Sequence, residues 1–109
     1  TPIKHMVYLM EALRIHAPIV FVSGRRESTR FATARWLREH KFVPIFQEII
    51  LYMRPDDDHR DDDVLKIEML ARVRADGYEP IMAFDDRNRV VKAWRDAGIP
   101  CAQVAEGDF

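Results

Sequence analysis

Residues 18–25 read Pro18-Ile19-Val20-Phe21-Val22-Ser23-Gly24-Arg25, an apolar run that stops abruptly at a serine, a glycine and an arginine. Residues 80–86 follow the same plan as Pro80-Ile81-Met82-Ala83-Phe84-Asp85-Asp86, with two carboxylates at the stop. Short apolar runs of this length are typical of strands buried in a parallel sheet. Both stretches therefore predict a buried strand that ends in polar side chains.

Helical patterns alternate with these strands, and further strands are expected at residues 48–53 and 101–104. Four helices are expected. The first begins at Pro2 with Thr1 as its N-cap, and the second begins at Ser28 or Thr29. The third follows the aspartate-rich stretch 56–63 and ends at Gly77, and the fourth follows Asp86 and ends at Gly98. Their expected inner faces carry Ile3, Met6, Val7, Met10 and Leu13; Phe31, Ala34 and Leu37; Val64, Ile67, Leu70 and Ala71; and Val90, Val91, Trp94 and Ala97. Alternating strands and helices predict an α/β fold with a mainly parallel, Rossmann-like sheet flanked by helices.

The composition limits the class of protein. A chain of 109 residues, with 48% apolar and 32% charged residues, fits one folded domain with one core. The net charge of -1 gives no overall field for nucleic acid or an anionic membrane, so any charged ligand must be held by local groups. The single cysteine excludes an internal disulfide, and no apolar run approaches the ~20 residues of a membrane span. No signal-peptide pattern opens the chain, so we expect a cytoplasmic protein without membrane contact.

Two polar clusters are the first candidates for chemistry. In open α/β sheets ligands bind beyond the carboxyl ends of the strands, so Ser23-Gly24-Arg25 and Asp85-Asp86 are expected on one edge. Adjacent carboxylates repel each other, and Mg2+ relieves that repulsion; the alternative is that Asp86 only caps the next helix. A serine hydroxyl, free backbone N–H groups and an arginine fork suit phosphate, whereas Ser-Gly is also an ordinary turn signal.

Other polar residues are less specific. Asp62 and Lys66 stand four apart at the start of a helix, either as a surface ion pair or with Lys66 as a fixed charge that Asp62 positions. The run of aspartates at 56–63 lacks the glycine and the distal glutamate of an EF-hand, so most of its carboxylates are expected in solvent. Cys101 is expected in a strand as a small buried hydrophobe rather than a nucleophile.

Taken in order, Ser23 after a buried strand, Lys66 on a helix and Asp85-Asp86 after a later strand resemble the haloacid dehalogenase superfamily of phosphohydrolases. The strings at residues 22–25, 62–66, 85–87 and 103–109 are similar to the phosphatase domain of phage-type polynucleotide kinase-phosphatase. This resemblance implies that Ser23, Gly24 and Arg25 bind the substrate phosphate and that Lys66, positioned by Asp62, neutralises the nucleophile and the phosphoryl oxygens. It also implies that Asp85 and Asp86 hold Mg2+.

The family's Asp-x-Asp-Gly-Thr motif, which carries the nucleophile, does not occur in the chain. We therefore expect residues 1–109 to be a phosphatase domain lacking its N-terminal nucleophile strand, and inactive alone, or else a catalytically dead relative. The leading hypothesis is a Mg2+-dependent 3'-phosphatase of DNA or RNA ends that works through an aspartyl-phosphate intermediate, beside a kinase domain in the full-length relatives. The alternatives are a phosphatase of nucleotides or small phosphomonoesters and a non-catalytic metal- and phosphate-binding module. The sequence leaves open whether the protein is a homo-oligomer.

Overall fold

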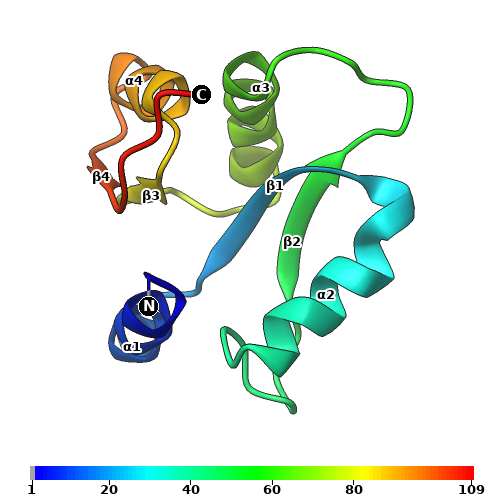
Figure 1. Ribbon diagram of the computed structural model, residues 1–109, viewed down its shortest axis with the longest axis vertical. Coiled ribbons are helices and arrows are strands. Elements are labelled where there is room, and N and C mark those ends of the chain that lie inside the picture. The colour runs from blue at the N-terminus through cyan, green and yellow to red at the C-terminus, as the bar shows by residue number, and fades with distance from the viewer. Residues whose placement is uncertain (1) are drawn as a thin grey trace. The chain divides into compact units, whose positions relative to one another are not determined.

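Four helices, four strands and a short 3-10 helix make up the computed structural model, which describes residues 2–109 (Figure 1). In chain order they are α1 (Pro2–Arg14), β1 (Val20–Arg26), η1 (Glu27–Thr29), α2 (Arg30–Glu39), β2 (Ile50–Arg54), α3 (Asp62–Ala75), β3 (Ala83–Asp85), α4 (Asn88–Asp96) and β4 (Cys101–Gln103). The chain divides into two compact units, Thr1–Asp57 and Asp58–Phe109. The expected N-cap, Thr1, lies outside the described residues. Among residues 2–109 no helix is long and apolar enough to cross a membrane.

Each unit contains one strand–helix–strand motif with parallel strands. In the first unit β1 pairs with β2 across the connection that contains α2, and in the second β3 pairs with β4 across α4 (Figure 1). Parallel neighbours need a crossover of this kind, because a tight turn cannot return the chain to the same end of the sheet. The predicted α/β class with parallel strands is therefore confirmed.

The strand β1 differs from the prediction in length and in burial. It continues past Val22 to Arg26, and its apolar residues are only half-buried, whereas Leu51, Tyr52 and Met53 of β2 are buried. Ser23 pairs with Met53 and Arg26 with Arg54, so the pairing register shifts between Ser23 and Arg26. A local irregularity of this kind keeps the chain extended while re-aiming its side chains. Ser23, Gly24 and Arg25 thus lie in an irregular strand end rather than after it.

The helix α2 buries a different face from the expected one. Phe31, predicted to face inward, is 81% exposed, while Thr33 and Leu37 are buried. Residues four apart lie on one face of a helix, and the pair that is covered here is offset by two positions from Phe31. The prediction for Leu37 is confirmed and that for Phe31 is wrong.

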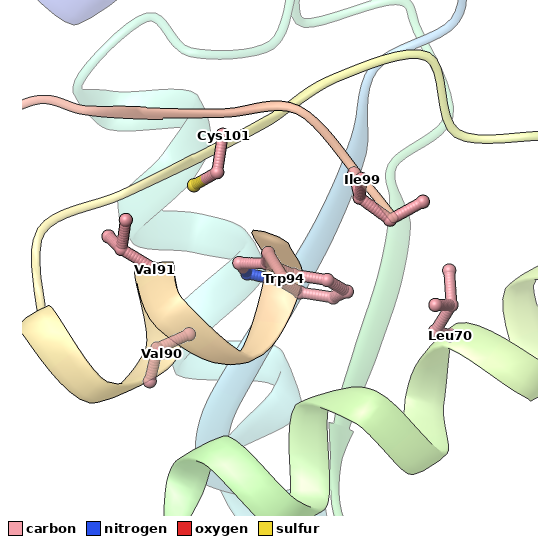
Figure 2. Packing of buried hydrophobic residues seen from close by; sticks show 6 residues of the cluster. All are labelled: Leu70, Val90, Val91, Trp94, Ile99 and Cys101. Atoms are coloured by element: carbon pink, nitrogen blue, oxygen red, sulfur yellow. The ribbon is translucent and has the colours of Figure 1, made fainter. Parts of the chain in front are cut away.

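The apolar core of the second unit gathers around α4. Val90, Val91 and Trp94 are buried, as predicted, and they cluster with Leu70, Ile99 and Cys101. Figure 2 shows the Trp94 side chain reaching from α4 toward Leu70 on α3. Gly98 follows α4 with φ +85°, a left-handed backbone that glycine adopts at little cost. Ala97, the remaining predicted inner residue, is exposed.

The helix α3 begins at Asp62, inside the aspartate-rich stretch rather than after it, and ends before Gly77 as expected. The prediction that Leu70 is buried is confirmed, whereas those for Val64 and Ala71 are wrong. The buried residues of the helix are Leu65, Met69, Leu70 and Val73, whereas Val64 is 51% exposed and Ala71 is exposed. Ile67 is partly buried against the core. Gly77, with φ +97°, follows the end of the helix as predicted.

Candidate functional site

At the end of β3 the Asp85 carboxylate accepts three hydrogen bonds. Its Oδ2 accepts a hydrogen bond from Nζ of Lys66 at 3.0 Å, and its Oδ1 accepts from the backbone N–H groups of Asp86 at 2.9 Å and Arg87 at 3.3 Å. The side chains of Lys66 and Asp85 are only 13% and 10% exposed. Charge-assisted bonds between such buried groups fix both side chains in one geometry. The structure therefore brings two of the predicted site residues together.

Asp62, predicted to position Lys66, binds another partner. Its Oδ2 accepts a hydrogen bond from Nη1 of Arg87 at 3.0 Å, and both side chains are about three-quarters buried, with 24% of Arg87 and 22% of Asp62 exposed. Lys66 is held by Asp85 instead. The i, i+4 spacing made an ion pair of Asp62 and Lys66 plausible. In the folded chain each of them instead pairs with a residue distant in the sequence, Asp62 with Arg87 and Lys66 with Asp85.

Asp86 is exposed, and among residues 2–109 the structure gives its carboxylate no ion pair. No group of three or more His, Cys, Asp or Glu side chains able to hold a metal ion occurs within that part of the chain. Mg2+ nevertheless takes only one or two carboxylates and completes its octahedron with water and substrate oxygens. The donor set therefore fits Mg2+, with Asp86 as the free carboxylate and Asp85 already shared with Lys66.

The second predicted cluster lies in the first unit, at the irregular end of β1. The backbone N–H of Arg25 donates to Oγ of Ser23 at 3.1 Å, so this N–H is not one of the free groups that the sequence suggested for phosphate. Nε of Arg54 donates to the carbonyl of Gly24 at 2.8 Å and ties the irregular segment to β2. The Arg25 side chain is exposed, and the Ser23 hydroxyl keeps its own hydrogen to donate. Both retain groups that can bind an anion.

The aspartate-rich stretch is engaged in other ways. Asp56 accepts the backbone N–H of Ser28 at 2.9 Å, and Asp58 binds the Arg60 guanidinium through its two oxygens. Hydrogen bonds with Asp58 and then Glu68 raise the pKa of Arg60 above its usual range. Cys101 is buried as predicted, and desolvation raises the pKa of its thiol. These side chains serve local structure rather than a metal site.

Sequence reasoning assigned no role to Arg87, which the structure makes central. Its guanidinium binds Asp62 and lies 4.6 Å from the ring centroid of Phe109, while its backbone N–H bonds to Asp85. Gly107 is buried in the same segment as Phe109. Gly107 stands between Glu106 and Asp108, and this local sequence does not indicate a close approach to another part of the backbone.

Comparisons with known proteins agree on one family. The family model "Polynucleotide kinase PNKP phosphatase domain" matches residues 1–109. The chain is 32% identical over 100 residues to the "Putative bifunctional polynucleotide kinase/RNA ligase" of Autographa californica nuclear polyhedrosis virus, a match that covers 92% of the chain and 13% of that protein.

Two solved structures are also similar. A structure of the Pnkp1/Rnl/Hen1 RNA repair complex matches at 30% identity and a TM-score of 0.82 over 94% of the chain and 32% of the matched one. A second structure of a Pnkp1/Rnl/Hen1 complex matches at 29% identity and a TM-score of 0.81, over 94% of the chain and 35% of the matched one. The chain thus spans about a third or less of each of these relatives.

Proposed function

This chain belongs to the family of polynucleotide kinase PNKP phosphatase domains, and we propose that it is part of a Mg2+-dependent 3'-phosphatase of nucleic-acid ends. The observation that carries the proposal is the buried ion pair of Lys66 and Asp85 directly beside the exposed carboxylate of Asp86. A fixed ammonium group next to a free carboxylate suits phosphoryl transfer, which depends on cations positioned around the phosphoryl oxygens.

Lys66 is the cation that the chain itself supplies. An ammonium group has three N–H donors, and the bond to Asp85 uses one of them. The other two can bind a phosphoryl oxygen and a carboxylate nucleophile without breaking the ion pair. Asp85 thereby becomes the residue that positions Lys66, while Asp62 acts one step further away by holding Arg87.

Asp86, together with Asp85, would hold Mg2+. The bound ion supplies a second positive charge for the phosphoryl oxygens, which Lys66 alone cannot fully neutralise. Asp86 suits direct binding because its side chain is exposed and its backbone N–H is already bonded to Asp85. The backbone N–H bonds to Asp85 also spread the negative charge of the pair over fixed dipoles.

The family resemblance alone assigns Ser23 and Arg25 to binding of the substrate phosphate and Gly24 to close approach of the backbone. In this proposal the first aspartate of the family's Asp-x-Asp motif, which is not among residues 1–109, attacks phosphorus as the ester P–O bond breaks. The second aspartate of that motif donates the proton with which the nucleic-acid 3'-oxygen leaves. Water then hydrolyses the aspartyl phosphate and releases inorganic phosphate. From the family resemblance we also propose a Rossmann-like sheet to which a further strand, not among residues 1–109, contributes the nucleophile.

The substrate class comes from the relatives. Their names include polynucleotide kinase, RNA ligase and RNA repair complex, which points to polynucleotide ends as substrate and to repair as the setting. A kinase domain on the same polypeptide is part of the proposal.

The test measures phosphate release by the full-length protein from a 3'-phosphorylated oligonucleotide, with and without Mg2+. A 5'-phosphorylated oligonucleotide and a 3'-mononucleotide serve as matched substrates, and the Asp86→Asn variant serves as the protein control. We expect Mg2+-dependent release from the 3'-phosphorylated oligonucleotide and loss of release in the variant. Preference for the mononucleotide would replace the proposal by a nucleotide phosphatase, and no release from any substrate would remove the phosphatase assignment.

A further inference from the structure

The segment Gln103–Phe109, which we name the brace, contacts the four consecutive residues 85–88, and these include both carboxylates of the candidate metal site. The backbone N–H of Val104 donates to the carbonyl of Asp85 at 3.0 Å. Nε2 of Gln103 donates to the carbonyl of Asp86 at 3.0 Å and to Oδ1 of Asn88 at 2.6 Å. The brace therefore pairs the carbonyl of the last residue of β3 and the carbonyl of the residue that follows it.

The closest contact involves Gly107. A Cβ atom built on this glycine would lie 2.6 Å from the carbonyl carbon of Asp86 and 2.9 Å from Cα of Arg87. Both atoms belong to the backbone, so no side-chain rotation could make room. The carbonyl of Gly107 also accepts the backbone N–H of Asn88, the first residue of α4, at 2.7 Å. Only glycine fits at position 107, because a side chain there would overlap the backbone of Asp86 and Arg87.

Phe109 provides the third contact. Its ring lies 4.6 Å from Cζ of Arg87, whose guanidinium also binds Asp62 at the start of α3. A cation over an aromatic face is attracted by the negative face of the ring. The ring and Asp62 together hold Arg87, and the backbone N–H of Arg87 in turn bonds to Asp85.

We propose that the brace fixes the turn at residues 85–88 and that Gly107 and Phe109 are positioning residues for Asp86 and for the pair of Lys66 and Asp85. Neither residue touches substrate or metal in this proposal. They act by holding the backbone whose N–H groups bond to Asp85 and whose next side chain is the free carboxylate of Asp86. The catalytic part of this inference rests on the proposed function, whereas the structural part does not.

The experiment compares Gly107→Ala, Phe109→Leu and Phe109→Tyr in the full-length protein, with Glu106→Gln as the matched control. Glu106 lies in the brace, but its side chain is exposed. The first readout is hydrogen exchange of the Asn88 amide without metal, measured by mass spectrometry on peptides spanning residues 86–92. The second is the Mg2+ concentration that gives half-maximal phosphate release, measured apart from the KM for the oligonucleotide.

In Gly107→Ala we expect exchange at Asn88 to become at least about 10-fold faster and the Mg2+ requirement to rise about 10- to 100-fold, as for other residues that orient metal ligands. The KM at saturating Mg2+ should change little. Phe109→Leu should shift both readouts in the same direction by a smaller factor, and Phe109→Tyr, which keeps the ring, should restore them. If Gly107→Ala does not fold, the comparison of Phe109→Leu with Phe109→Tyr still tests whether the brace positions the metal site.

Two results would overturn the proposed role of the brace. In the first, Asn88 exchange and the Mg2+ requirement are unchanged in both Gly107→Ala and Phe109→Leu. In the second, Glu106→Gln shifts both readouts as much as those variants do. If the wild-type protein releases no phosphate but Gly107→Ala or Phe109→Leu still loses protection at Asn88, the brace is supported. In that case the proposed function alone fails.

Discussion

Replacing Lys66 by methionine leaves the Asp85 carboxylate, 10% exposed, without its cationic partner. Removing one member of a buried ion pair costs about 3–5 kcal/mol, because the remaining charge stays desolvated. Asp85 keeps two backbone hydrogen bonds to Oδ1, so the cost should fall at the lower end of that range. We expect Lys66→Met to lower the free energy of unfolding of the second unit by about 3 kcal/mol.

The assay is urea unfolding of the 109-residue chain followed by Trp94 fluorescence. Trp94 is buried in the core of the second unit, and a Trp36→Phe background removes the other tryptophan, so the signal reports this unit alone. Lys92→Met is the matched control: its ion pair with Asp96 is exposed, at 75% and 65% for the two side chains, and should contribute at most about 0.5 kcal/mol.

A double-mutant cycle separates the ion pair from other effects of the substitution. In Lys66→Met with Asp85→Asn the buried charge is gone on both sides, and replacing both partners is often close to neutral. The double variant should therefore be more stable than the sum of the single changes predicts, by about 2 kcal/mol. Additive losses, or a Lys66→Met loss no larger than that of Lys92→Met, would refute the assignment of a buried pair.

Three further outcomes follow from single contacts. Asp86→Asn should reduce Mg2+-dependent phosphate release by the full-length protein at least about 100-fold while leaving the circular dichroism spectrum unchanged, because the side chain is exposed; a wild-type rate removes Asp86 from the site. Cys101 should react with iodoacetamide at pH 8 at least about 10-fold more slowly in the native chain than in urea, since desolvation raises the pKa of its thiol and lowers the thiolate fraction; equal rates contradict this burial. Gly77→Ala should lower the free energy of unfolding by about 1 kcal/mol in thermal or urea unfolding, from backbone strain at φ +97° alone, since nothing lies within 4 Å of the added methyl group; an unchanged stability excludes that strain.

Local pattern predicted the order of the elements but not always their extent or the faces that they bury. The buried strand expected from Pro80 is wrong for residues 80–82: β3 begins only at Ala83, and Ile81 and Met82 are 75% and 48% exposed. In α4 the apolar residues form one narrow stripe, so Val90, Val91 and Trp94 could be placed inside from spacing alone. The helix α3 carries apolar residues on more than one side, and two helical stripes compete for the core. Packing against its neighbours in the second unit selects the stripe that contains Leu65 and Met69, which local spacing does not encode.

The candidate site was predictable as a set of residues and not as a set of contacts. The end of an apolar strand pointed to Asp85, the family resemblance pointed to Lys66, and the structure joins the two side chains. Neither signal could identify Arg87 or Gly107, because their roles depend on bringing residues about twenty positions apart into contact. The sequence presents Gly107 as one more glycine in a polar stretch, although its missing side chain admits the backbone of Asp86.

The charges at this end of the second unit explain why it should take a cation before it takes a phosphate. Three carboxylates, Asp62, Asp85 and Asp86, lie on elements joined by the ion pairs with Lys66 and Arg87. Each of these two cations is bound to one carboxylate, which leaves the exposed charge of Asp86 in excess and makes the site repel a phosphate dianion. If Asp86 holds Mg2+ as proposed, the ion would reverse that sign, while Lys66, still bonded to Asp85, would keep two donors for the phosphate oxygens. Metal binding is therefore expected to precede productive substrate binding, with the ion pair of Lys66 and Asp85 intact in both states.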